Sequence, residues 1–417
     1  MRNIYLIDLI CGISAALDYV SPHVVGHHKR VAMGSAVLAN HLGVKPPSLM
    51  DLLLAALLHD IGAFSLHVVL DGLDFDTDVT EHAVAGHRLL RGHPFLARAS
   101  RMVLHHHTPW RDLREADNGD DAETLLLANV INMADRIDIL RRGKGYQRSR
   151  EEVREIVDRI SEAYIAPEVK RAFLEQADST LFWTLMEGME DSIRDVMGSE
   201  LLKQHISMSE MLSFSDFFTH IIDFRSRHTA THSKGVAETA VQLAGLAGMT
   251  PREQEYMRLA GNLHDIGKLA VPVRLLDKPG KLDPTEYIRV QDHMRVADTV
   301  LRDIPGLDEI ADWACQHHER LNGKGYPHGL TADDLSQGSR IMQVADVFTA
   351  ITEDRPYRKG MDREKTVGVL TSMADKGFLD KDIVGLAVGH YEAIDAIRRI
   401  SQTQALAEFK LFTDGEY

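Results

Sequence analysis

His59-Asp60-Ile61-Gly62 occurs twice in this chain, because the same four residues return as His264-Asp265-Ile266-Gly267. Searching outward finds further pairs, which keep an offset of 205 positions or, after a short insertion, of 211 positions. The paired residues are His27 with His232, His82 with His293, His106-His107 with His317-His318, and Asp135 with Asp346. This ordered repeat predicts two related domains, which we expect at residues 1–200 and 201–417.

Helical periodicity surrounds both copies of the repeat. Residues 52–58, 151–163, 181–197 and 252–263 place apolar side chains at helical spacing, whereas the alternation typical of strands is scarce. The hydrophobic content of 44% is enough for two buried cores. We therefore expect an all-α protein built from two tandem helical bundles.

The charge and the cysteine content restrict partners and environment. A formal net charge of −15 disfavours nucleic-acid polymers and anionic membranes as partners, because both require basic surfaces. Cys11 and Cys315 are too few for a disulfide framework, and we interpret the apolar first twenty residues as an ordinary helix. A cytoplasmic protein without a membrane span is the expectation.

The seven repeated positions in each half are all of metal-ligand type. Imidazole and carboxylate groups bind iron, zinc, manganese and similar ions, and seven such groups are enough for two ions. Adjacent residues on a helix project about 100° apart, so Asp265 can bridge two ions while His264 binds one of them. Paired ions attract phosphate and lower the pKa of a water molecule, which predicts phosphodiester hydrolysis.

The C-terminal repeat, over about residues 216–360, resembles the HD-GYP family of the HD phosphohydrolase superfamily. The matching stretches are His232-Ser233-Lys234-Gly235-Val236, His264-Asp265-Ile266-Gly267-Lys268, Lys278-Pro279-Gly280-Lys281-Leu282, His293, His317-His318-Glu319-Arg320, Gly323-Lys324-Gly325-Tyr326-Pro327, Val344-Ala345-Asp346-Val347-Phe348 and Arg355-Pro356-Tyr357-Arg358. The resemblance implies an all-helical domain that hydrolyses cyclic di-GMP to linear pGpG or GMP with two or three iron or manganese ions.

The resemblance also implies roles for individual residues. One metal would be held by His232, His264, Asp265 and Asp346, and the other by Asp265, His293, His317 and His318. Asp265 and Lys268 are the expected catalytic residues, and the expected substrate contacts are Lys268, Tyr326, Arg355, Arg358 and Lys359. His228 stands where three-metal members of the family have a glutamate, so a third ion stays open although we favour two. Glu319 either orients a neighbouring ligand or is a surface acid.

The N-terminal repeat keeps the ligand types without the other family features. Its expected ligands, for a second pair of metal ions, are His27, His59, Asp60, His82, His106, His107 and Asp135. Ala63 occupies the position of Lys268, and no Gly-Tyr-Pro loop follows His107. A second hydrolase, a metal- or redox-dependent sensor and a structural relic all fit this pattern, and we favour a regulatory domain.

Several alternatives stay open at this point. Cyclic di-GMP is the default substrate, and 3′,3′-cyclic GMP-AMP is the alternative, because no base-reading residue is identifiable. Other function classes are a non-catalytic receptor for the cyclic dinucleotide or for a diguanylate cyclase partner, and a di-iron oxygenase. The complete ligand set and Lys268 favour hydrolysis. The oligomeric state is not indicated, and a homodimer is one option.

Overall fold

The computed structural model describes residues 4–19, 25–65, 80–116, 119–142, 147–187, 204–224, 231–278, 280–354 and 359–413. In these ranges the regular structure is helical, and the β-type pairing consists of two isolated bridges, Tyr5 with His205 and Asn322 with Thr331. Contacts divide the chain into two compact units, Tyr5–His205 and Ile206–Tyr417 together with Met1–Ile4. The predicted all-α class is confirmed.

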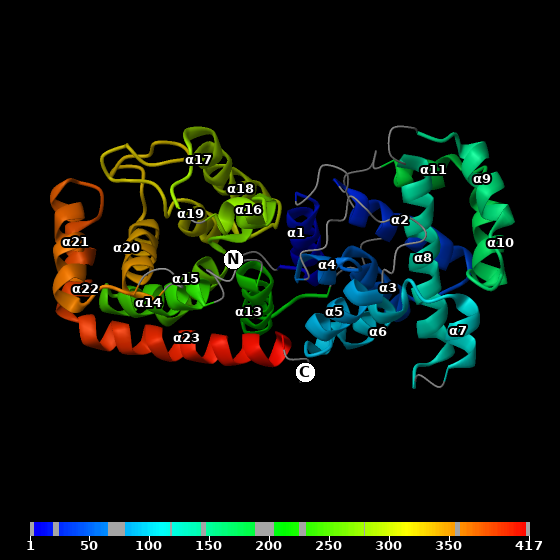
Figure 1. The fold of residues 1–417 in the computed structure, drawn as a ribbon, viewed down its shortest axis with the longest axis horizontal. Helices are drawn as coiled ribbons and strands as arrows, with labels where there is room; N and C mark the ends of the chain where they lie inside the picture. The colour runs from blue at the N-terminus through cyan, green and yellow to red at the C-terminus, as the bar shows by residue number, and fades with distance from the viewer. Residues whose placement is uncertain are drawn as a thin grey trace. The chain divides into compact units, whose positions relative to one another are not determined.

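The first unit is a bundle centred on α2, α3, α6 and α8 (Figure 1). α2 packs against α3 and α8, and α6 packs against the same two helices. The helices of this unit are α1 (Leu6–Asp18), α2 (His27–His41), α3 (Pro46–Leu57), α4 (Ile61–Ser65), α5 (Thr80–Leu90), the 3-10 helix η2 (Pro94–Leu96), α6 (Ala97–His105), α7 (Trp110–Glu115), α8 (Ala122–Arg142), α9 (Arg150–Arg159), α10 (Pro167–Gln176) and α11 (Thr180–Met186).

The second unit repeats this plan around α14, α15, α19 and α20. α14 packs against α15, α20 and the long helix α23, which runs alongside it in Figure 1. The helices of this unit are α13 (Met208–Phe224), α14 (His232–Leu246), α15 (Pro251–Leu263), the 3-10 helix η3 (Ile266–Ala270), α16 (Val273–Leu276), α17 (Pro284–Gln291), α18 (His293–Arg302), α19 (Asp308–Cys315), α20 (Gln337–Thr352), α21 (Arg363–Asp375), α22 (Lys381–Gly389) and α23 (Tyr391–Thr413).

The repeated histidines lie at helix ends in both units. His27 and His232 are the first residues of α2 and α14, and His293 is the first residue of α18. Each His-Asp pair begins one or two residues after the end of α3 or α15, and each His-His pair begins one or two residues after the end of α6 or α19. The packing of these helices brings their ends together, so the histidines and aspartates, which are far apart in sequence, lie close to one another in each bundle.

The glycine of each His-Asp-Ile-Gly motif permits a close backbone contact. A Cβ atom at Gly267 would lie 1.8 Å from the carbonyl oxygen of His293, and one at Gly62 would lie 2.0 Å from that of His82. No side chain fits at either distance, so the glycine allows the third histidine of each repeat to lie against the turn that holds the aspartate. The motif is therefore a packing requirement as well as a pair of polar residues.

Candidate metal centres

The seven residues predicted for the C-terminal centre lie together. Their ligand atoms form two groups, each within 4.8 Å, which are His232 with His264 and Asp346, and His293 with His317 and His318. Asp265 faces both groups, since its Oδ2 is 3.2 Å from His264 Nε2 and its Oδ1 is 3.7 Å from His293 Nε2. This is the arrangement that a carboxylate bridging two ions requires.

Backbone hydrogen bonds orient three of these imidazoles. In His264, His293 and His317, Nδ1–H donates to the carbonyl three residues earlier in the chain, at 2.7, 2.5 and 2.6 Å. This bond leaves Nε2 as the atom with a lone pair, pointing into the cluster. Nε2 of His264 and of His293 and Oδ1 of Asp265 are buried and have no hydrogen-bond partner among the described residues. Buried, unpaired acceptors that converge in this way fit a metal ion.

Burial and neighbouring charges keep three of these groups in the forms that bind metal. Burial lowers the pKa of His293 to about 4 and that of His317 to about 3, so both imidazoles are neutral at pH 7. Burial alone would raise the pKa of Asp265, but His264 and Lys268 outweigh it and hold this pKa well below its usual range. Asp265 is therefore ionised at pH 7, and His293 and His317 are uncharged.

Glu353 contacts a predicted ligand, His232, and the sequence did not indicate it. It is buried after the end of α20, and its Oε2 is 3.1 Å from Nδ1 of His232. Gln402 on α23 donates from Nε2 to the same Oε2 at 3.0 Å. Burial lowers the pKa of His232, but Glu353 and Asp346 outweigh it and raise that pKa to about 10. The first histidine of the repeat is thus held by a carboxylate rather than by a backbone carbonyl.

Lys268 and Tyr326 lie beside the cluster, as expected for substrate contacts. Lys268 Nζ donates to Asp265 Oδ2 at 2.5 Å, and the Tyr326 ring centroid is 4.7 Å from that of His318. Lys359 is exposed, whereas the other predicted positions, Arg355, Arg358 and His228, lie outside the described residues.

Glu319 is buried and holds a loop, so the alternative of a surface acid is wrong. Its carboxylate accepts hydrogen bonds from the backbone N–H groups of His328, Gly329 and Leu330, at 2.7, 3.2 and 3.0 Å. A Cβ atom at Gly325 would lie 2.3 Å from Glu319 Cα, which explains the glycine before Tyr326. Glu319 therefore shapes the loop that places Tyr326 on His318.

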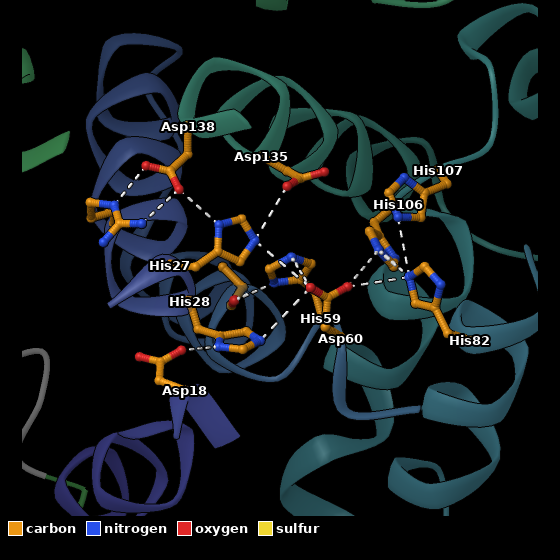
Figure 2. A network of polar contacts seen from close by, with 12 residues as sticks. Asp18, His27, His28, His59, Asp60, His82, His106, His107, Asp135 and Asp138 are labelled. Carbon is orange, nitrogen blue, oxygen red and sulfur yellow. Dashed lines mark hydrogen bonds and ion pairs between the residues drawn. The ribbon is translucent and has the colours of Figure 1, made fainter. Parts of the chain in front are cut away.

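The seven residues predicted for the N-terminal centre also lie together, as Figure 2 shows. Asp60 again faces two groups, since its Oδ2 is 3.3 Å from His59 Nε2 and its Oδ1 is 3.2 Å from His82 Nε2. His27 Nε2 is 3.4 Å from Asp135 Oδ1. The remaining two, His106 and His107, complete the group around His82. This half therefore contains a second candidate metal centre.

Four residues around the N-terminal centre were not predicted. His28 is completely buried, and its Nδ1 lies 2.6 Å from Asp18 Oδ1. Asp138 Oδ2 lies 2.8 Å from Nδ1 of His27, and Arg30 holds Asp138 through two hydrogen bonds of 2.6 and 2.9 Å. Adjacency to His27 was the available signal for His28, and the position one turn beyond Asp135 was the signal for Asp138.

Comparison with known proteins identifies the family. HD-domain family models match residues 24–140 and residues 216–383. A Vibrio cholerae protein named 3′3′-cGAMP-specific phosphodiesterase 1 is 30% identical over 398 residues, which cover 93% of this chain and 92% of that protein. The chain belongs to the tandem HD-domain phosphodiesterases. The expected HD phosphohydrolase with an additional N-terminal HD domain is confirmed, and the oxygenase alternative finds no support in these relatives.

Other proteins match part or all of this phosphodiesterase. A cyclic di-GMP phosphodiesterase of Pseudomonas aeruginosa is 38% identical over 141 residues, which cover 34% of each chain. A crystal structure of a cyclic GMP-AMP specific phosphodiesterase of V. cholerae has a TM-score of 0.64 at 20% identity, and covers 97% of this chain and 98% of its own. That structure shares the tandem fold.

HD domains depend on metal ions, and each unit of this phosphodiesterase provides a candidate cluster of histidines and aspartates. Among the helices that the structure describes, none combines the length and the hydropathy needed to cross a membrane.

Proposed function

We propose that the C-terminal centre hydrolyses a 3′,3′-linked cyclic dinucleotide, with cyclic GMP-AMP as the preferred substrate. The observation that supports hydrolysis is the position of Asp265, whose two oxygens face two separate groups of imidazoles. The choice of substrate is supported by the relative that spans both domains, which is named as specific for 3′3′-cGAMP. Cyclic di-GMP is the second candidate, because partial relatives of the C-terminal half are named as cyclic di-GMP phosphodiesterases.

We propose two divalent ions, iron or manganese, as the cofactors of this centre. The ligands of one would be His232, His264, Asp265 and Asp346, and those of the other Asp265, His293, His317 and His318. When bound, such a pair supplies a water of lowered pKa and positive charge for the phosphate. His228 is kept as the candidate ligand for a third ion.

The protein residues around the centre then bind and orient the substrate. Lys268 would meet the scissile phosphate, which is supported by the position of its Nζ at the Asp265 carboxylate and by its positive charge. Tyr326 presents its ring beside His318, where it would contact the nucleotide. Arg355, Arg358 and Lys359 are proposed as further phosphate contacts.

We propose that residues 1–200 form a metal-binding regulatory domain and residues 201–417 the catalytic domain. The N-terminal centre would use His27, His59, Asp60, His82, His106, His107 and Asp135 for a second pair of ions. Ala63, at the position of Lys268, removes the basic group that would meet a phosphate. A cytoplasmic location, pairing with diguanylate cyclase domains and a homodimer complete the proposal.

The test is turnover by the full-length chain. Protein purified anaerobically and loaded with iron or manganese is incubated separately with 3′,3′-cyclic GMP-AMP and cyclic di-GMP, with Asp265→Ala as the inactive control. Linear dinucleotide from both substrates, faster from cyclic GMP-AMP, is expected. Binding of either nucleotide without a linear product would instead indicate a receptor, and faster turnover of cyclic di-GMP would reverse the order of the two substrates.

A further inference from the structure

His28 is a buried imidazole with no histidine counterpart in the other repeat. It is the second residue of α2, and the equivalent position in α14 is Ser233. Its Nδ1 is 2.6 Å from Asp18 Oδ1, and the other oxygen of Asp18 accepts the backbone N–H of Gly26 at 2.8 Å. With Nδ1–H donating to a fixed carboxylate, the ring cannot turn freely and Nε2 has the lone pair.

The free end of this imidazole points into the N-terminal centre. His28 Nε2 is buried, finds no hydrogen-bond partner in the described part of the chain, and lies 3.8 Å from Asp60 Oδ2. Figure 2 shows the succession from Asp18 through His28 to Asp60. The ligand atoms of His28, His59 and Asp60 lie within 4.8 Å of one another. Buried polar atoms normally have partners, so an oriented Nε2 without one indicates a ligand.

The distances indicate which ion this imidazole would join. Three Nε2 atoms converge on Asp60 Oδ2, from His59 at 3.3 Å, His27 at 3.7 Å and His28 at 3.8 Å. Ligands of one ion, each about 2.1 Å from it, lie about 3 to 4 Å from one another. His59 Nε2 has one lone pair and can therefore bind only one ion. His28 Nε2 lies near both His59 Nε2 and Asp60 Oδ2, so it would join the ion that these two atoms bind.

We infer that His28 is a fifth protein ligand to the ion held by His27, His59, Asp60 and Asp135. This inference rests on the metal centre proposed above for residues 1–200. The corresponding ion in the C-terminal half would have four protein ligands, because Ser233 replaces the fifth.

The additional ligand has a consequence for what the N-terminal centre can do. Catalytic metal sites keep positions open for water or substrate, whereas structural sites are closed by protein ligands. Five protein ligands leave about one position on a six-coordinate ion, against about two in the C-terminal half. The N-terminal centre is therefore built to retain its ion, which suits a sensor or a structural clamp better than a second phosphodiesterase.

The experiment measures retention of manganese(II) by the full-length chain. His28→Ser, which copies the C-terminal repeat, is made in the Asp265→Ala background so that the C-terminal ions do not contribute. Metal per chain is measured at saturating manganese, and its loss is followed after excess EDTA is added. His41→Ser is the matched control, since His41 lies on the same helix and pairs with Glu175 at 2.6 Å.

The expected result is full occupancy at saturation with one ion lost at least about 10-fold faster than in the control. Asp18→Asn, which keeps the side-chain size, should accelerate the loss less, and it tests the inference if His28→Ser does not fold. Unchanged release in a folded His28→Ser chain, or in Asp18→Asn where His28→Ser does not fold, would overturn the inference. A His28→Ser chain that binds one manganese ion fewer than the control at every manganese concentration would also overturn the inference, since His28 would then hold a separate ion. The readout involves no nucleotide, so it does not depend on the proposed substrate.

Discussion

The N-terminal and C-terminal centres share one ligand plan but differ in what surrounds it. In both, the aspartate that follows the second histidine faces two groups of imidazoles. Its Oδ2 lies 3.3 Å from Nε2 of that histidine in the N-terminal centre and 3.2 Å in the C-terminal centre. Lys268 reaches Asp265 in the C-terminal centre, whereas Ala63 takes its place in the N-terminal one. His28 is added to the N-terminal centre alone. A set of histidines and aspartates can thus be present in both halves of a chain while the lysine beside it is present in only one.

The first histidine of each repeat shows that one role can be filled from different positions. Asp138, held by Arg30, accepts from His27, whereas Glu353, held by Gln402, accepts from His232. The position equivalent to Arg30 is Gly235, and a Cβ atom there would lie 2.7 Å from Gln402 Nε2. Loss of the arginine side chain thus makes room for the glutamine of α23.

Replacing the two bridging aspartates gives the largest expected contrast. Asp265→Ala should lower turnover of the cyclic dinucleotide by about 1,000-fold or more, because it removes the carboxylate that faces both groups of the catalytic centre. Asp60→Ala should leave turnover within a few-fold of wild type. Steady-state formation of the linear dinucleotide at saturating manganese measures both. An equal loss of turnover in the two variants would contradict the assignment of catalysis to the C-terminal centre alone.

Lys268→Ala should have the next largest effect. We expect kcat to fall about 100-fold, because a positive charge aimed at the phosphate is lost, while manganese per chain stays unchanged. Lys268→Arg is the control that keeps the charge and should recover part of the rate. A parallel loss of metal would show instead that Lys268 acts by holding Asp265.

Glu353→Gln and Asp138→Asn should have similar, smaller effects on their own centres. Each removes the charge behind the first histidine, which should weaken manganese binding about 10- to 100-fold in that half only. Titration of metal-free protein with manganese measures the change. Glu392→Gln, on an exposed acid of the catalytic unit, is the control and should bind like wild type. A loss of affinity in the opposite half would contradict the assignment.

Gln402→Ala should show the smallest change. Gln402 donates to Glu353 and to the carbonyl of Thr231 and accepts from Arg398, but it hydrogen-bonds to no predicted ligand, so its removal should weaken manganese binding less than about 10-fold. Gln404→Ala, at an exposed position of the same helix, should change nothing. An effect as large as that of Glu353→Gln would mean that α23 organises the centre as strongly as the Glu353 carboxylate does.

The sequence was enough to predict the all-α fold and to group the repeated histidines that lie together in the structure. Helical periodicity is local, and ligands such as His264 and Asp265 repeat with their neighbours at a constant offset. A search for matched pairs finds these positions without any knowledge of the packing.

The same search could not find residues that differ between the repeats. His28 pairs with a serine, so the offset that revealed His27 hid its neighbour. Glu353 and Asp138 hold equivalent histidines from non-equivalent positions, and Gln402 lies 49 residues beyond Glu353 on another helix. Such contacts depend on how helices pack, which no spacing rule within one segment encodes.

The hydrogen bonds from imidazole Nδ1 to a carbonyl three residues earlier couple each cluster to the ends of its helices. In the C-terminal unit, those carbonyls belong to Gly261 and Ala314, in the last turns of α15 and α19, where carbonyl groups have no N–H partner within the helix. Unwinding that turn would release the ring to rotate, and a bound ion opposes this. Occupancy of the cluster and hydrogen-exchange protection of the amides ending α15 and α19 are thus thermodynamically linked, and each should rise with the other.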